Sequence, residues 1–292
     1  MDIELILIAI LSHNIFDFIL QIKLFRCYRF PICKGDGNDL KRKKNIYKII
    51  KGNLMHTCSH FLGLCLIVLV INLIKSDQVI FPMSKIILIC LAHFIIDLLK
   101  SLIYLFRTST QNNIWIFLID QFLHLMVISS VIYDFNILYF IRQLKYKFLT
   151  YPNSFNLSEK ILITSIIFIV STWAVGIFIK VLISYISSEA NKLNITENIG
   201  KNIIGDNGTV IKIASSEAKN GGYLIGILER ILILISIAMN YPVMIGFVLT
   251  AKSVARLKKL SNDSFAEYFI IGTFFSFIAA VLGGIIIRSL FN

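Results

Sequence analysis

The chain has little charge and an odd number of cysteines. Charged residues make up only 16% of its 292 residues, whereas hydrophobic residues make up 57%. Globular proteins contain about 25% charged and roughly 45–50% apolar residues. The mean hydropathy of +0.77 comes from long apolar runs rather than from an even spread. These values exclude a water-soluble enzyme, a disulfide-rich secreted module and an ordinary DNA-binding domain, and they predict an integral membrane protein.

The five cysteines show no spacing that is typical of a zinc knuckle or a disulfide framework. Cys58, Cys65 and Cys90 lie inside apolar segments, while Cys27 and Cys33 flank a basic stretch. Nothing in the sequence indicates an oxidising compartment. We therefore expect reduced thiols that serve mainly in packing.

Acidic residues are also scarce, with 17 Asp and Glu against 29 Lys and Arg, which gives a net charge of +12. Such an excess could indicate nucleic acid as a partner. In a membrane protein it is explained by cytoplasmic loops, which collect Lys and Arg. We therefore expect membrane lipids as partners and no specific nucleic acid.

The apolar runs predict an all-α, polytopic transmembrane helix bundle with about six or seven spans. A span needs about 20 mostly apolar residues. Six segments meet or approach this length: 3–22, 54–74, 86–106, 114–133, 161–186 and 266–290. The region 223–251 is long for one span and short for two, and Pro242 could start a second short helix there. The first segment lacks a basic start and a small-residue cleavage site, so we expect a span rather than a signal peptide.

The distribution of basic residues predicts an orientation in the bacterial cytoplasmic (inner) membrane. The segment 23–52 is rich in Lys and Arg, which places it in the cytoplasm and the N-terminus outside. The side of Lys252, Arg256, Lys258 and Lys259 depends on whether the chain turns back at 242–251. The stretch 188–222 is polar and reads as a linker or small flap. We divide the chain into a four-helix bundle (1–141), a fifth span with the linker (142–222) and C-terminal membrane helices (223–292).

The strongest signal is the placement of the five histidines. Each has a His or Asp four residues away, in the pairs His13/Asp17, His56/His60, His93/Asp97 and Asp120/His124. Spacing i,i+4 puts both side chains on one face of a helix, and each pair lies on a different predicted span. One histidine on an apolar face is compatible with a structural hydrogen bond, but four such pairs on consecutive spans favour a functional site.

The depth of the pairs predicts one shared metal centre. At 1.5 Å per residue, all eight side chains fall within roughly one or two turns of a common level in the cytoplasmic leaflet. They would line the core of the four-helix bundle, as in bundle proteins that hold two metals. Imidazoles and carboxylates without a required thiolate suit Zn²⁺, or less specifically Mn²⁺ or Fe²⁺. Eight candidate ligands exceed one tetrahedral site, so we expect two ions, although some of the eight could instead orient a ligand.

Lys100 continues the stripe of His93 and Asp97. It could simply neutralise Asp97, or it could stabilise negative charge that develops on a phosphate or a tetrahedral intermediate. We therefore name Lys100, Asp97 and Asp17 as candidate catalytic residues. In the C-terminal part, Glu229 or Glu267 is expected to pair across helices with Lys252 or Arg256, with binding of a phosphate head group by the basic residues as the alternative.

These motifs resemble the domain of unknown function 3307 family of bacterial integral membrane proteins. The resemblance rests on His13-x-x-x-Asp17 with Gln21, His56-x-x-x-His60, His93-x-x-x-Asp97-x-x-Lys100 and Asp120-Gln121-x-x-His124, and on C-terminal stretches around Glu229-Arg230, Lys252 and Glu267-Tyr268. It implies a polytopic membrane protein without an established activity. A looser likeness links the His-x-x-x-Asp pattern to membrane-bound metal-dependent hydrolases and to the zinc phospholipase C/nuclease superfamily, whose N-terminal metal ligand has no counterpart here.

Three functions fit this pattern. The first is a metal-dependent hydrolase that acts on a phosphoester or lipid-type substrate near the cytoplasmic face. The second is a transporter of metal ions or protons, because His and Asp residues within membrane spans commonly form ion pathways and proton relays. The third is a non-enzymatic membrane anchor or effector with a structural metal, acting through the basic segment 34–51.

Overall fold

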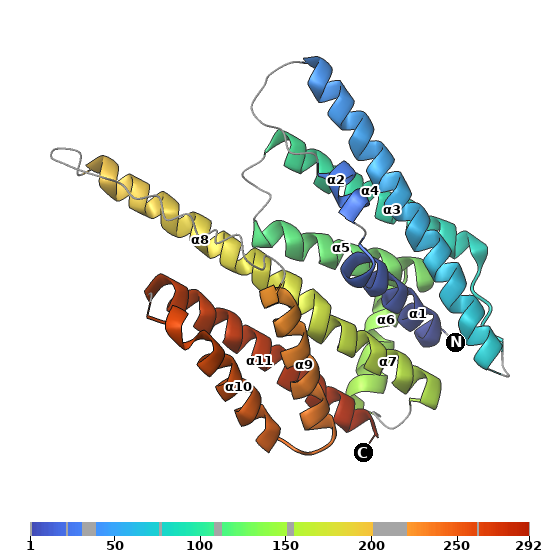
Figure 1. The fold of residues 1–292 in the computed structure, drawn as a ribbon. Helices are drawn as coiled ribbons and strands as arrows, with labels where there is room; N and C mark the ends of the chain where they lie inside the picture. Colours follow the sequence, from blue (N-terminus) through green and yellow to red (C-terminus); the bar gives the residue numbers. More distant parts are fainter. Residues whose placement is uncertain are drawn as a thin grey trace.

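A computed structural model describes residues 2–21, 23–30, 39–75, 78–107, 113–150, 155–200, 221–261 and 263–291. These residues form helices and short connections, without a strand (Figure 1). The α-helices are α1 (Asp2–Asn14), α2 (Lys23–Arg29), α3 (Asp39–Ile74), α4 (Met83–Phe106), α5 (Ile114–Ile132), α6 (Ile137–Leu144), α7 (Leu157–Ile169), α8 (Val175–Gly200), α9 (Gly221–Ala238), α10 (Val243–Arg256) and α11 (Asp263–Phe291). Shorter turns are the π-helical η1 (Ile15–Ile19), η3 (Lys145–Thr150) and η5 (Val170–Ala174) and the 3₁₀ turn η6 (Leu257–Lys259).

The predicted membrane bundle is confirmed. Among the described residues, five helical stretches are long and apolar enough to cross a membrane: Asn45–Ile74, Met83–Phe106, Ile114–Ile132, Leu157–Ser188 and Phe265–Phe291. Each coincides with a predicted segment. The remaining predicted segments also fold as helices, the first as α1 continued by η1 and the region 223–251 as α9 and α10.

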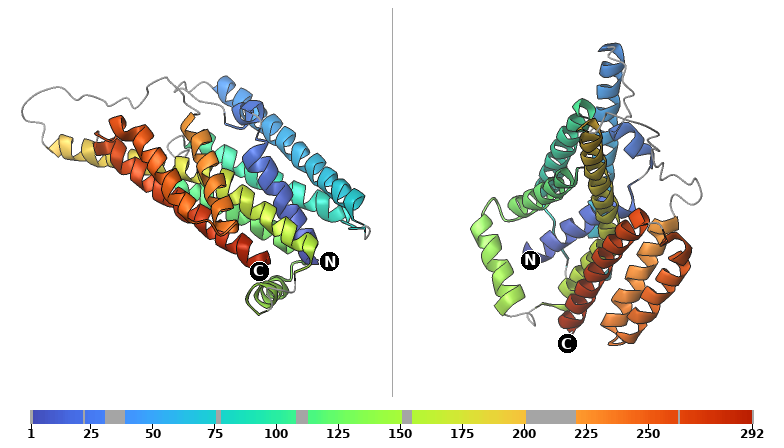
Figure 2. Two further views of the ribbon diagram at one scale, coloured as in Figure 1. Left: turned by 60° about the horizontal axis from the view of Figure 1, so that its bottom comes forward. Right: turned by 90° about the vertical axis from the view of Figure 1, so that its left-hand side faces the viewer.

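The chain does turn back after α9. Asn240 adopts a positive φ of 61°, and Pro242 precedes α10, which packs alongside α9 (Figure 2). A Cβ on Gly222, near the start of α9, would lie 3.9 Å from the Arg256 guanidinium, so α10 ends where α9 begins. The expected pairing of charges is confirmed for Glu229, whose carboxylate accepts a 2.7 Å hydrogen bond from Lys252.

Two connections expected from polarity are largely helical. The basic segment 23–52 contains α2 and the first part of α3, and α8 continues through the polar stretch as far as Gly200. The 36 residues of α3 have a length of about 54 Å, against roughly 30 Å for the hydrocarbon core, so this helix extends beyond the membrane. Lys and Arg favour helix in water, which is why polarity alone did not indicate the helix ends. Residues 31–38, with Cys33, and 201–220 lie outside the described residues.

Helix α1 occupies the centre of the first half of the chain. It packs against α3, α5 and α7, and its residues 4–9 are all buried. The π-helical turn η1 carries Asp17 onward from α1, and Gly63 of α3 leaves room for the Phe16 ring beside it. A helix that is covered on all sides can hold polar groups away from lipid. The His13 and Asp17 side chains are therefore directed into protein rather than into the bilayer.

Gly52 allows α2 to lie directly on α3. A Cβ there would come within 2.6 Å of the Tyr28 Cβ and 2.8 Å of the Arg29 nitrogen. We expect Gly52→Ala to lower the free energy of unfolding by about 1–3 kcal/mol, because the backbone of α2 must move. Thermal unfolding in detergent measures this loss. Gly246→Ala is the matched control, since a Cβ at Gly246 meets nothing within 4 Å and alanine favours the helix. Equal stability of the two variants would contradict the prediction.

Candidate metal centre

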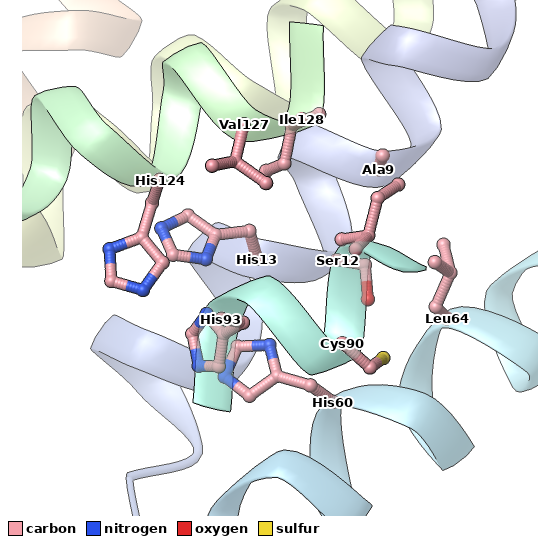
Figure 3. Close-up of a pocket in the computed structure, with 11 residues that line it drawn as sticks. Ala9, Ser12, His13, His60, Leu64, Cys90, His93, His124, Val127 and Ile128 are labelled. Carbon is pink, nitrogen blue, oxygen red and sulfur yellow. The ribbon is translucent and has the colours of Figure 1, made fainter. Parts of the chain in front are cut away.

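The five imidazoles meet in the core of the bundle. Their ring centroids form a continuous cluster, with separations of 4.0 Å for His60–His93, 4.4 Å for His93–His124, 4.6 Å for His56–His60 and 4.9 Å for His13–His124. All five side chains are buried. Figure 3 shows four of them, from α1, α3, α4 and α5, directed toward one another. The structure thus brings together the side chains that the sequence places on four separate helices.

One group of candidate ligands consists of Asp17, His56, His60 and His93, whose ligand atoms all lie within 4.8 Å of one another. The Asp17 Oδ1 atom is 3.1 Å from Nε2 of both His56 and His60, and these two nitrogens are 3.2 Å apart. Zinc–nitrogen bonds of 2.0–2.1 Å in a tetrahedron put ligand atoms about 3.3 Å apart. The triangle therefore has the dimensions of one face of a zinc site.

A second group consists of His93, Asp97 and His124. The His124 Nδ1–H donates a 2.7 Å hydrogen bond to the Asp120 carbonyl oxygen, which leaves the lone pair on Nε2. That Nε2 is buried and has no hydrogen-bond partner among the described residues, and the same holds for Nε2 of His93 and for Oδ2 of Asp97. Although Asp97 Oδ2 is 3.2 Å from His93 Nε2, the geometry is not that of a hydrogen bond. Buried acceptors that face one another in this way could hold a cation.

Two of the eight predicted ligands lie at the margins of these groups. His13 Nε2 is 3.7 Å from Asp17 Oδ2, and it too is buried without a hydrogen-bond partner among the described residues. Asp120 instead accepts hydrogen bonds at Oδ2 from Lys100 (2.5 Å) and from Gln121 (3.0 Å). Seven of the eight side chains thus face the shared centre, whereas Asp120 faces Lys100 and supports His124 through its backbone. That these residues bind metal stays a prediction.

The candidate catalytic residues have different surroundings. Asp17 touches three of the imidazoles, and Asp97 lies between two imidazoles and a guanidinium. Lys100 pairs with Asp120 rather than with Asp97, the partner considered from sequence. The reason is that Asp97 is already occupied by a cation from elsewhere in the chain.

That cation is Arg29, which sequence reasoning assigned to the basic segment. Its Nη2 lies 2.6 Å from Asp97 Oδ1, and its Nε donates a 2.9 Å hydrogen bond to Asn53 Oδ1. Asn53 in turn donates to Ser101 Oγ at 3.1 Å. Asn53 and Ser101 continue the helical stripes of His56 and Asp97, so their spacing could have indicated them. Arg29 carries no such signal, because only the fold of α2 onto α3 brings it to the site.

A small cavity adjoins the imidazoles. Its volume is about 20 Å³, and Figure 3 shows that its walls combine His13, His60, His93 and His124 with Ala9, Leu64 and other apolar side chains. A volume of about 10–15 Å³ is sufficient for one water molecule. The histidine layer therefore borders a space that can hold a water-sized ligand.

Comparisons with known proteins support the family but give no activity. The family model described as protein of unknown function (DUF3307) matches residues 36–150. No curated protein and no solved structure matches the chain. The matched region contains His56, His60, His93, Asp97, Asp120 and His124, whereas His13, Asp17 and the C-terminal motifs lie outside it. Residues 36–150 of this membrane protein are therefore similar to the DUF3307 family.

Proposed function

We propose that the protein is a membrane-embedded, metal-dependent hydrolase that acts on a phosphoester or lipid-type substrate near the cytoplasmic face. The observation that carries this proposal is a set of buried nitrogen and oxygen atoms on His13, His93, His124 and Asp97 that have no hydrogen-bond partner among the described residues. Unpaired buried acceptors cost free energy unless a ligand satisfies them. A divalent cation is the ligand that imidazole nitrogens and carboxylate oxygens share, and zinc suits this set best.

The seven converging side chains could hold two ions, although the two ligand groups share His93 and neither includes His13. Asp17, His56, His60 and His93 would complete one tetrahedral site. Asp97 and His124 would then form the second site together with His13, whose ring stacks on His124 with a centroid separation of 4.9 Å. Three protein ligands would leave one position open, as in catalytic rather than structural zinc sites.

An open position of this kind would favour hydrolysis over a purely structural metal. A bound zinc ion lowers the pKa of its water to about 7, so hydroxide is available near neutral pH. In hydrolysis of a phosphoester, the water oxygen forms the new P–O bond, the ester P–O bond breaks, and the alkoxide takes the proton from water. Asp17 or Asp97 would accept that proton from water and pass it to the alkoxide, and Lys100 would stabilise charge on the phosphate.

Phosphate release and metal movement can be measured together in vesicles. Zinc-loaded protein is reconstituted with a long-chain alkyl phosphate in the bilayer and a zinc-sensitive dye in the lumen. We expect release of inorganic phosphate without zinc flux, and a loss of roughly 100-fold or more in Asp97→Asn. Cys58→Ala is the control, because this exposed thiol lies between His56 and His60 on α3 but faces away from the centre. Zinc flux without hydrolysis would reject the hydrolase in favour of a transporter.

A further inference from the structure

Arg29 is a buried cation with a free hydrogen-bonding position beside the candidate metal centre. It is only 2% exposed, although it ends a short helix in the basic segment. Two of its nitrogens are held by Asp97 and Asn53, but Nη1 is buried and has no hydrogen-bond partner among the described residues. Neutralisation of Asp97 needs only one side of the guanidinium. The other side is left available for an additional acceptor.

A second cation lies on the same side of the centre. Along α4, the cavity-lining Ile89 and Cys90 are followed by His93, then by Asp97, and then by Lys100. The Lys100 Nζ atom lies 2.5 Å from Asp120 Oδ2, one helical turn beyond Asp97, and its side chain is 17% exposed. The apolar cavity therefore lies on one side of the imidazoles, and the two cations lie on the other.

With two divalent ions bound, the net charge of the core would favour an anionic ligand. Arg29 pairs with Asp97 and Lys100 pairs with Asp120, whereas Asp17 contacts only imidazoles among the described residues. These three carboxylates and two cations leave one net negative charge when the imidazoles are neutral. Two divalent ions would change this to three positive charges in a low-dielectric interior, where unbalanced charge is costly. One hydroxide together with a dianionic phosphate monoester would restore neutrality.

We propose that Arg29 and Lys100 bind the non-bridging oxygens of a phosphate monoester and present its phosphorus to the metal centre. This inference rests on the proposed function and narrows its substrate class. The planar guanidinium provides N–H donors in a fork that matches phosphate oxygens, and the ammonium adds a mobile point charge. Arg29 lies in the basic segment 23–52, and Lys100 lies on α4 beyond Asp97. The head group of a lipid phosphate would enter from the side of this basic segment.

Binding of inorganic phosphate to zinc-loaded protein in detergent tests the proposal. Zinc content and phosphate affinity are measured for the wild type, Arg29→Gln, Arg29→Lys and Lys100→Gln. We expect unchanged zinc in Lys100→Gln and phosphate affinity about 10- to 100-fold weaker in both glutamine variants, as for lost charged hydrogen bonds. Arg29→Lys should recover part of the loss. Arg26→Gln is the matched control, because Arg26 lies one turn earlier on α2 and is exposed, and it should change affinity less than about twofold.

The possible outcomes separate this inference from the proposed function. Wild-type protein that binds no transition metal would reject both. If zinc-loaded wild type does not bind phosphate at millimolar concentration, only the phosphate site is rejected. The same conclusion follows if Arg26→Gln and Lys100→Gln lose equal phosphate affinity. If Arg29→Gln also loses zinc, Arg29 acts through Asp97. The phosphate affinity of Lys100→Gln then decides whether the phosphate site exists. An unchanged affinity in that variant overturns the proposal, and a weakened one supports it.

Discussion

Replacement of His93 by alanine is expected to remove at least one zinc ion per chain and to weaken any remaining site by about 100-fold or more. His93 belongs to both candidate ligand groups, and its ring lies within 5.5 Å of the other four imidazole rings, measured between centroids. Loss of an outer-shell partner alone costs 10- to 100-fold in metal affinity, so loss of a shared ligand should cost more. Elemental analysis of purified protein, followed by competition with a zinc chelator, measures both effects.

Two further variants test whether the loss of zinc in His93→Ala is specific to the shared ligand. Cys58→Ala should keep the full zinc content, because the Cys58 thiol is exposed between His56 and His60 and faces away from the cluster. His13→Ala should affect mainly the ion proposed for Asp97 and His124, because the His13 ring stacks on His124 with a centroid separation of 4.9 Å and His13 lies outside both ligand groups. A His93→Ala protein that is folded and carries as much zinc as Cys58→Ala would contradict the shared centre.

The second large effect is expected on stability. Adding zinc at about 1,000 times its Kd should raise the free energy of unfolding of metal-stripped protein by about 4 kcal/mol. Without a cation, the ligand atoms of His124, His93 and Asp97 remain buried without a hydrogen-bond partner among the described residues, and each such group costs about 1–3 kcal/mol. Denaturant unfolding in detergent, with zinc added to chelator-treated protein, measures the gain.

Two controls test whether the gain in stability is specific to zinc bound at this centre. Mg²⁺ should give almost no gain, because it prefers oxygen ligands in octahedral geometry. His93→Ala/Asp97→Ala should be insensitive to zinc, since it lacks ligands of both groups. A wild type whose stability is the same with and without zinc would show that the imidazoles pack without a metal.

The helical bundle and the histidine layer follow from sequence alone. Long apolar runs must satisfy their backbone hydrogen bonds internally, which dictates helices within a membrane. The spacing i,i+4 fixes a shared face for each pair such as His56/His60, and the direction of the chain fixes their common depth. Because both rules are local, they predict the histidine layer without knowledge of how the helices pack.

Contacts between distant segments were decided only by tertiary structure. The pairing of Lys100 with Asp120, and of Arg29 with Asp97, depends on the rotation of each helix and on the close approach of α2 to α3 at Gly52. Likewise, the turn at Asn240 decided that α10 returns beside α9. A pattern along one helix specifies which side chains share a face, but only packing selects which faces meet. The sequence therefore determined the candidate metal ligands, whereas the fold determined the cations that surround them.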